Sequence, residues 1–357
     1  MPCSWSRLFS LFLLTAGLML AQHGHKGGSG DSMPGITPSD LIVHGTVVLA
    51  EGMAPVRLVR VDHICGGRTM NSAYADSKGR FSFNLGVLDR DITAYGSNTQ
   101  TSGVVTSAAG MKTCSVRASI PGYHAQSASL EQAGTKEKTS LGELLLKPIG
   151  TPQNPLMSVT DAQVHPNAMK DFEKGLDLAS KAKLPDAIAA MKKAVSGDKK
   201  FATAWLALGI LQVSQNQTAN AQESYDEAIA ADEKFAAPLI EAAALEAVAG
   251  QWDKVIEHTS RAISLDPDSF ALAYYLNAMG NIRLTQADAA NKSATAGLRV
   301  DEDHEYPDIA YMQGILLVSK GDRQNARTQF ESYLALAPNG INAANARQQL
   351  TELAAAK

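Results

Sequence analysis

The spacing of apolar residues along the chain changes near residue 148. Before that point, apolar and polar residues alternate in short runs, as Phe81, Phe83 and Leu85 do with their polar neighbours. A period of two predicts β-strands with one buried face. After residue 166 the apolar residues follow a helical period instead, and alanine becomes the dominant residue. The pattern therefore predicts a β domain followed by a helical one.

The β-prone runs of the first part are separated by turn residues at regular distances. Glycine-containing turns lie at 51–52, 76–79 and 121–122. This rhythm predicts an all-β sandwich of about seven antiparallel strands over residues 40–148. The runs that we interpret as strands are 41–49, 56–61, 80–85, 114–120 and 141–147.

The helical part repeats itself. Successive members of three series of corresponding positions are spaced by 34, 34, 34 and 37 residues. Five copies at a nearly fixed period predict an array of helical hairpins. The series are Gly175, Gly209, Ala243, Asn277 and Gly314; Ala187, Ala221, Val255, Ala289 and Ala326; and Ala194, Ala228, Ala262, Ala296 and Tyr333.

The second copy resembles the tetratricopeptide repeat. Trp205, Leu208 and Gly209 match the first helix of that family, and Ala221, Tyr225 and Ala228 match the second; Pro267, Gly314, Ala326, Phe330 and Pro338 match in later copies. The resemblance implies an all-α array of about five hairpins over residues 167–357, ending in a capping helix from Ile341 to Lys357. We expect Asn345, Arg347, Gln348, Gln349 and Glu352 to face outward on that helix.

The same resemblance implies a groove for protein or peptide partners, lined by the first helices. It assigns the partner groove to Phe172, Leu176, Leu206, Ile210, Ile240, Tyr274, Tyr311 and Ile315, with Ala244 and Ala278 beside them. None of these residues is Lys or Asn, so capture of a C-terminal carboxylate is disfavoured. The alternative is that these side chains form the core between hairpins and leave only a narrow groove.

The β part resembles a carboxypeptidase regulatory-like domain of prealbumin-like fold. The resemblance rests on Gly45–Val48, Ala54–Val59, the hairpin Asp76–Phe83, the turn Ala118–Tyr123 and the late Leu144–Leu146. It implies a non-catalytic accessory module. We attribute Asp76 and the glycine after it to the local geometry of a hairpin turn rather than to calcium binding.

The N-terminal segment has the pattern of a secretory signal peptide over residues 1–21, with Arg7 before the apolar run and Ala21 before the expected cleavage site. A Gly-, His- and Pro-containing leader, residues 22–39, follows, and a Pro-rich linker over 149–166 joins the two domains. His23 and His25 in the leader fit a solvated tail better than a metal site.

Export predicts an oxidised cysteine pair. The mature chain would keep Cys65 and Cys114, which we expect to form a disulfide, with two unlinked buried thiols as the alternative. We predict no metal site and no cofactor.

The remaining chemistry argues against an enzyme. With a net charge of −4, the chain has no excess positive charge to attract nucleic acid. The sequence also contains no recognised catalytic or phosphate-binding motif. The acidic run 301–308 fits a solvated loop, with cation binding as the alternative, and His258 and His304 fit surface positions.

We therefore predict an exported, non-catalytic adaptor that is periplasmic or extracellular in a bacterium and has no stable membrane span. One alternative is a carbohydrate-binding module of the cell envelope, for which Tyr74, Tyr95 and Tyr123 are the available aromatic residues. Another is an accessory subunit of a peptidase.

Overall fold

The computed structural model divides into residues 1–37 and residues 38–357, and the parts that it describes all lie in the second unit. The described residues are 40–50, 52, 54, 55, 57–65, 68–87, 113–120, 123–131, 138–148, 158, 161 and 163–355. The predicted signal peptide and leader lie outside them, as does most of the linker.

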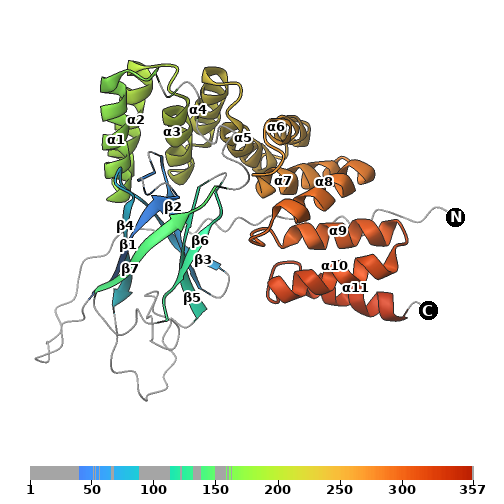
Figure 1. Cartoon of the computed structure of the whole chain (residues 1–357). Helices are drawn as coiled ribbons and strands as arrows, with labels where there is room; N and C mark the ends of the chain where they lie inside the picture. The colour runs from blue at the N-terminus through green and yellow to red at the C-terminus, as the bar shows by residue number, and fades with distance from the viewer. Residues whose placement is uncertain are drawn as a thin grey trace, which may run out of the picture. The chain divides into compact units, whose positions relative to one another are not determined.

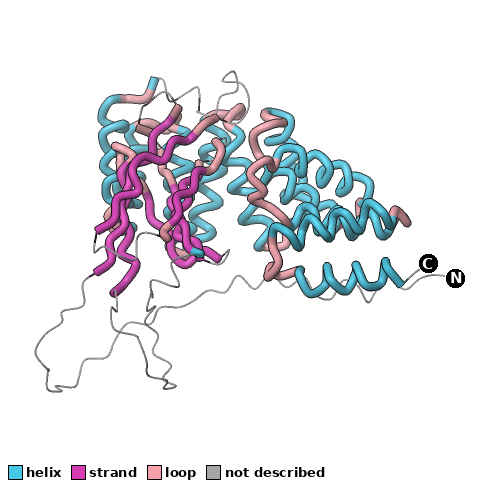
Figure 2. Tube along the Cα trace, turned by 60° about the horizontal axis from the view of Figure 1, so that its bottom comes forward, coloured by secondary structure: helices cyan, strands magenta, loops and turns pink. Residues whose placement is uncertain are grey.

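Seven described strands form two sheets, drawn in blue to green in Figure 1 and in magenta in Figure 2. One sheet has the order β4-β1-β7 and the other β3-β2-β5-β6. The predicted β-sandwich is therefore confirmed. The strands are β1 (Asp40–Leu49), β2 (Arg60–Cys65), β3 (Arg68–Tyr74), β4 (Arg80–Val87), β5 (Cys114–Ser119), β6 (Gln126–Ser129) and β7 (Lys138–Leu146).

The sandwich is not wholly antiparallel. β1 pairs antiparallel with β4 but parallel with β7, where Val47 lies opposite Leu144. After β6, the chain leaves the second sheet and returns to the edge of the first, where β7 runs in the same direction as β1. Alternation of apolar residues could not reveal this, because it is the same in both kinds of pair.

One predicted strand is displaced. Residues 57–59 of the expected strand 56–61 are irregular, and the strand that contains Val61 begins at Arg60. Leu58 packs into a cluster with residues of the helical array, whereas Val59 and Val61 point into the sandwich core. The apolar run is therefore shared between two cores.

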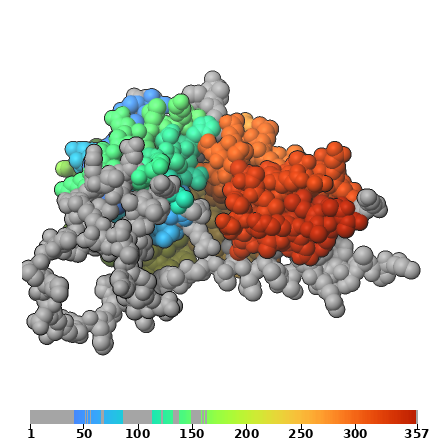
Figure 3. Space-filling view, turned by 90° about the horizontal axis from the view of Figure 1, so that it is seen from below, coloured from blue at the N-terminus to red at the C-terminus, as the bar shows by residue number. Residues whose placement is uncertain are grey.

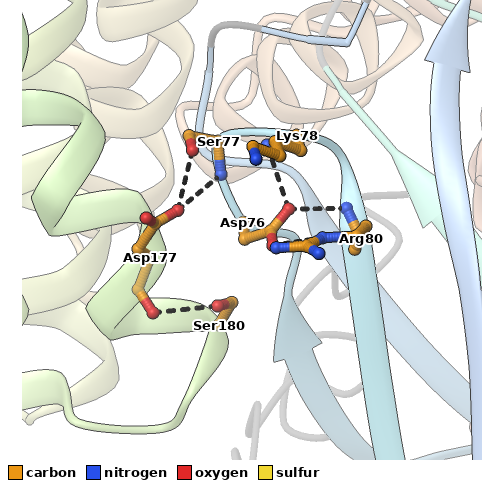
Figure 4. Close-up of polar contacts among 6 residues, drawn as sticks. All are labelled: Asp76, Ser77, Lys78, Arg80, Asp177 and Ser180. Carbon is orange, nitrogen blue, oxygen red and sulfur yellow. Dashed lines mark hydrogen bonds and ion pairs between the residues drawn. The ribbon is translucent and has the colours of Figure 1, made fainter.

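The Cys65–Cys114 disulfide is present, as predicted, and joins residues directly opposite each other on β2 and β5. Asp76 has the predicted turn role: its Oδ1 accepts from the backbone N–H groups of Lys78 and Arg80 at 3.0 and 2.8 Å, and its Oδ2 pairs with the Arg80 side chain (Figure 4).

Ten described helices form five antiparallel hairpins, and an eleventh follows (Figure 1). The hairpins are α1/α2 (Pro166–Ser180, Leu184–Gly197), α3/α4 (Ala202–Ser214, Thr218–Ala231), α5/α6 (Ala236–Val248, Trp252–Leu265), α7/α8 (Ala271–Arg283, Ala287–Val300) and α9/α10 (Asp308–Ser319, Arg323–Leu336); α11 spans Ala343–Ala355. None of the described helices is long and apolar enough to cross a membrane.

The fixed period of 34 residues fails in the fourth hairpin. α7 begins 35 residues after α5, because the loop 266–270 before it is one residue longer than the loop 232–235. In this hairpin, the buried residues that correspond to Ala221 and Ala228 are therefore Ala290 and Gly297, rather than the predicted Ala289 and Ala296.

The small residues of the first helices lie where the two helices of a hairpin cross. A Cβ atom added to Gly209 would lie 2.3 Å from the Tyr225 ring, and one added to Gly314 would lie 2.7 Å from the Phe330 ring. Met191 fills the same place against Gly175. Glycine therefore permits the close approach that the resemblance implied.

Each turn within a hairpin contains one residue with a left-handed backbone. The positions are Ala182, Asn216, Gly250, Thr285 and Gly321, with φ between 55° and 78°. The β-branched side chain of Thr285 is unfavourable there. We expect Thr285→Gly to raise the free energy of unfolding by about 1 kcal/mol, and the reciprocal Gly250→Thr to lower it. Urea unfolding of both variants measures this, and a loss of stability in Thr285→Gly would contradict it.

The terminal helix departs partly from prediction. Arg347, Gln348 and Glu352 are exposed as expected, but Gln349 is buried and Asn345 is only partly exposed. Ala343 and Ala346 pack with Phe330 and Tyr333 of α10, and Gln349 shares their side of the helix.

Candidate functional site

The first helices of the hairpins present one common side of the array, which we call the first-helix face. Six of the eight predicted groove residues are buried on it: Phe172, Leu176, Leu206, Ile240, Tyr274 and Tyr311. Ile210 and Ile315 remain partly exposed. Most of these side chains therefore serve the core between hairpins, and a role in partner binding stays a prediction for them.

In the fourth hairpin, the longer loop before α7 brings Tyr275 to the position that corresponds to Ile240. Tyr275 stacks on Tyr306, with ring centroids 5.8 Å apart. Tyr274 instead donates a hydrogen bond to the carbonyl oxygen of Pro267 at 3.0 Å. Tyr275 therefore replaces Tyr274 among the candidate residues of the first-helix face.

The β-sandwich contacts this face at α1 and α3. Tyr74 and Leu58 belong to a buried cluster with Phe172 and Leu208. The Tyr74 hydroxyl shares a hydrogen bond of 2.7 Å with the Ser214 hydroxyl at the end of α3. Tyr74 was a candidate sugar-stacking residue, but its ring is occupied by this contact.

A polar contact joins the β3–β4 turn to α1. This turn links strands of different sheets, so the hairpin expected from the sequence at Asp76–Phe83 is a connection between sheets instead. The backbone N–H and the hydroxyl of Ser77 both donate to Asp177 Oδ1, at 3.0 and 2.8 Å (Figure 4). Asp76 and its neighbours fix the turn that presents Ser77, as Figure 4 shows. The turn motif noticed in the sequence therefore also positions a contact between the domains.

A small pocket lies at this junction. It is lined by Leu58 and Ile120 of the sandwich, by Leu206 and Ile210 of α3, and by Arg57. The Arg57 side chain is buried, and its Nη2 has no hydrogen-bond partner. Burial lowers the pKa of Arg57, and the negative charge of Asp161 opposes this only in part. A buried guanidinium nitrogen without a hydrogen-bond partner lowers the stability of the contact around it.

The far end of the sandwich contacts the acidic loop 301–307. His124 Nδ1 lies 3.0 Å from Asp303 Oδ2, and Arg117 pairs with Glu305. In Figure 3 the green surface of the sandwich meets the orange part of the array. The sequence suggested a solvated loop. The structure differs, because two acidic residues of this loop pair with the sandwich.

Asp301 in that loop has a different role. It is buried, and it accepts hydrogen bonds from the backbone N–H groups of Glu305 and Tyr306 at 2.8 and 2.9 Å. Asp198, Asp232 and Asp266 also follow second helices and accept backbone N–H groups of the next residues. These aspartates recur at nearly the repeat period, so their shared role could have been predicted from the sequence, although we did not predict it.

His258 is only partly at the surface that we predicted for it, with about one-fifth of its side chain exposed. Its Nδ1 lies 2.9 Å from Glu246 Oε2, and the Glu246 side chain is buried. Gln212 and Ser224 form the equivalent pair one hairpin earlier. These residues join the two helices of their hairpins and lie outside the first-helix face.

Glu241 on α5 faces Arg60 of the sandwich. Burial raises the pKa of Glu241, and the positive charge of Arg60 counteracts this only partly. The folded protein therefore holds the Glu241 proton more tightly than the unfolded chain does. The contribution of the Glu241 carboxyl to the free energy of unfolding is greatest at a pH below its pKa in the unfolded chain. It is lost as the pH rises through the pKa of this carboxyl in the folded protein.

We expect Glu241→Gln to stabilise the protein at about pH 7 and to have little effect near pH 4, close to the unfolded pKa of Glu. Melting temperatures of both proteins across this range measure the effect. Asp253→Asn, at an exposed position of α6, is the matched control. An equal gain at both ends of the range would show that the charge of Glu241 is not responsible.

Among the described residues, one group of side chains has the composition of a metal site: His63, Cys65 and Cys114, with all ligand atoms within 4.8 Å of one another. His63 was not among the residues that we predicted from the sequence. It lies two residues before Cys65 on β2, so both side chains point to the same face of the strand.

Comparison with known proteins identifies one repeat in the array. Residues 202–235, which include α3 and α4, match the family model described as tetratricopeptide repeat. The sequence has no significant match among curated proteins.

Several solved structures are similar to about half of the chain. One is described as YrrB, a TPR protein with an unusual peptide-binding site, with 20% identity, a TM-score of 0.44, and coverage of 51% of this chain and 92% of that one. Another is MamA, with 21% identity, a TM-score of 0.42, and coverage of 46% and 94%. A third is a tetratricopeptide repeat protein from Parabacteroides merdae, with 20% identity, a TM-score of 0.45, and coverage of 54% and 75%.

Proposed function

From the tetratricopeptide repeat matched at residues 202–235, we propose that this protein is a non-catalytic interaction scaffold whose first-helix face binds a folded partner protein. The observation that carries the proposal is the occupancy of that face. It already holds a folded domain of the same chain, through Tyr74 and Ser77 near α1 and α3 and through Arg117 near α9. A surface that accommodates one folded domain has the chemistry to accommodate another.

The contact with the sandwich is suited to exchange. One of its polar pairs is exposed: His124 and Asp303 are both about one-third exposed, so their pairing contributes little to stability. Arg57 is buried at the junction without a partner for its Nη2. We propose that a partner displaces the sandwich and then contacts Ile210 and Tyr275.

Affinity capture with variants of the full chain tests this proposal. Asp177→Ala combined with Asp303→Ala removes one polar contact near each end of the sandwich, and we expect it to increase capture of a specific partner. Ile210 also lines the junction with the sandwich, so Ile210→Lys is added to the Asp177→Ala/Asp303→Ala variant, in which the sandwich contact is already weakened. We expect it to reduce capture relative to that variant, because it places a charge on the first-helix face. A matched control is Asp186→Ala with Asp253→Ala, which removes two exposed acids from second helices. Unchanged capture by both test variants would refute a role for this face.

We further propose that the protein is exported and acts in the periplasm or outside a bacterial cell. The signal-peptide pattern of residues 1–21 and the oxidised Cys65–Cys114 pair support this. Mass spectrometry of the N-terminus from cell fractions tests it. We expect a mature chain that begins at Gln22, and an uncleaved chain confined to the cytoplasm would contradict the proposal. The likeness of the sandwich to carboxypeptidase regulatory-like domains stays a prediction, and no observation favours the glycan or peptidase alternatives.

A further inference from the structure

A histidine stands beside the disulfide of the sandwich. His63 is buried, and its Nε2 lies 3.2 Å from Cys65 Sγ. Its other ring nitrogen, Nδ1, lies 3.1 Å from Asn71 Oδ1 on the neighbouring strand β3. An amide oxygen only accepts hydrogen bonds, so Nδ1 carries the hydrogen in this contact. In the neutral ring, Nε2 then directs its lone pair towards the sulfur.

While the disulfide is intact, the Nε2 lone pair of His63 receives no hydrogen bond from Cys65, because a disulfide sulfur has no hydrogen to donate. Opening the S–S bond changes the chemistry of the site. It provides two thiols, which become soft ligands when they lose their protons, beside an imidazole nitrogen whose orientation Asn71 already fixes. A histidine ligand held through its second nitrogen in this way is a common feature of metal sites.

We propose that the dithiol form of this site binds Zn²⁺ through His63 Nε2, Cys65 Sγ and Cys114 Sγ. The fourth position of the tetrahedron is left for solvent. Reduction requires an external dithiol, which donates two electrons and two protons to the disulfide and is itself oxidised to a disulfide. Binding of Zn²⁺ then releases the two thiol protons to solvent.

The distances are compatible with such a site. Zinc–sulfur and zinc–nitrogen bonds of about 2.3 and 2.0 Å in a tetrahedron place the sulfur and nitrogen atoms about 3.5 Å apart and the two sulfurs about 3.8 Å apart. The ligand atoms already lie within 4.8 Å of one another. Cys65 and Cys114 are opposite each other on paired strands, so rotation of their side chains separates the sulfurs without a change of register. Cys65 is partly exposed, which allows a reductant to reach it.

The test uses the full chain with Cys3→Ser, so that the two site cysteines are the only thiols. The protein is reduced anaerobically with a phosphine, which takes up oxygen from water as the disulfide becomes two thiols, and is then titrated with Co²⁺ alone. We expect one Co²⁺ per chain, a near-ultraviolet sulfur-to-cobalt charge-transfer band, and loss of that band on addition of Zn²⁺. The unreduced protein should not show the band. Binding to the histidines of the leader would produce no sulfur band.

Two variants test the role of His63 and of the Asn71 hydrogen bond that orients its ring. Asn71→Ala should weaken Co²⁺ binding about 10- to 100-fold, and His63→Gln should weaken it further. His44→Gln, at an exposed position of β1, is the matched control and should bind as the parent does. Equal affinity in His63→Gln and the parent would overturn the proposal. The absence of the charge-transfer band in the reduced parent would also overturn the proposal, whether circular dichroism shows a folded sandwich or an unfolded one.

Discussion

Replacement of both Cys65 and Cys114 by serine should lower the free energy of unfolding of the sandwich by about 4 kcal/mol in the loop-closure model. The two cysteines are 49 residues apart, so the disulfide removes much of the conformational freedom of the unfolded sandwich. Hydrogen exchange detected by mass spectrometry measures this loss in the amides of β1 to β7. Because Trp205 and Trp252 lie on α3 and α6, tryptophan fluorescence follows the array separately.

Ser82→Ala, at an exposed position of β4, is the control for this experiment, because it changes a strand residue without touching the disulfide. We expect it to leave exchange in the sandwich unchanged. The double serine variant should also reduce the protection of α1 and α3, since Leu58 and Tyr74 of the sandwich pack against these helices. Protection of the strands equal to that of the parent would show that the disulfide does not stabilise this domain.

Gly209→Val should destabilise the array by about 3 kcal/mol, at the upper end of the usual cost of overpacking. The added side chain would lie against the ring of Tyr225, which is itself buried and cannot swing into solvent. Urea unfolding followed by the fluorescence of Trp205, on the same helix, measures the effect.

Gly197→Ala is the matched control, since an added Cβ there meets its nearest atom, Ala168 Cβ, at an ordinary 3.4 Å. We expect it to leave the stability unchanged or to raise it by up to about 1 kcal/mol, because alanine is the better helix former. Tyr225→Leu in the Gly209→Val background should recover part of the loss by making room for valine. If Gly197→Ala were as costly as Gly209→Val, contact with Tyr225 would not be the cause.

The parts of the fold that depend on local sequence could be predicted. Phe81, Phe83 and Leu85 alternate because one face of β4 is buried, and Gly209 and Tyr225 belong together because two helices cross there. The disulfide could also be predicted, because the two cysteines that follow the predicted signal peptide allow only one pairing.

Other features were missed because they depend on contacts between distant residues. The acidic residues 303 and 305 resemble a solvated loop until Arg117 and His124 are placed opposite them. Leu58 and Tyr74 resemble strand residues of the sandwich, yet they pack against the array. The register of the fourth hairpin was wrong for a simpler reason, since a single added residue in a loop does not disturb helical periodicity on either side.

The buried aspartates that follow the second helices bear on where an array of helical hairpins can gain residues. Asp266 accepts a backbone N–H from Ser269, and Asp301 accepts backbone N–H groups from Glu305 and Tyr306, so each aspartate bonds to residues near the end of the loop that it begins. Any residue except proline supplies such an N–H group. Because the bonds do not depend on side-chain identity, a loop between hairpins can gain residues while its aspartate keeps backbone N–H partners and the preceding hairpin is unchanged. Both departures from the 34-residue period occur there, and none occurs in the three-residue turns within hairpins. The longest loop between the described hairpins, 301–307, contacts the sandwich through Asp303 and Glu305. An array of similar hairpins can therefore acquire an individual attachment point by adding residues to a loop between them.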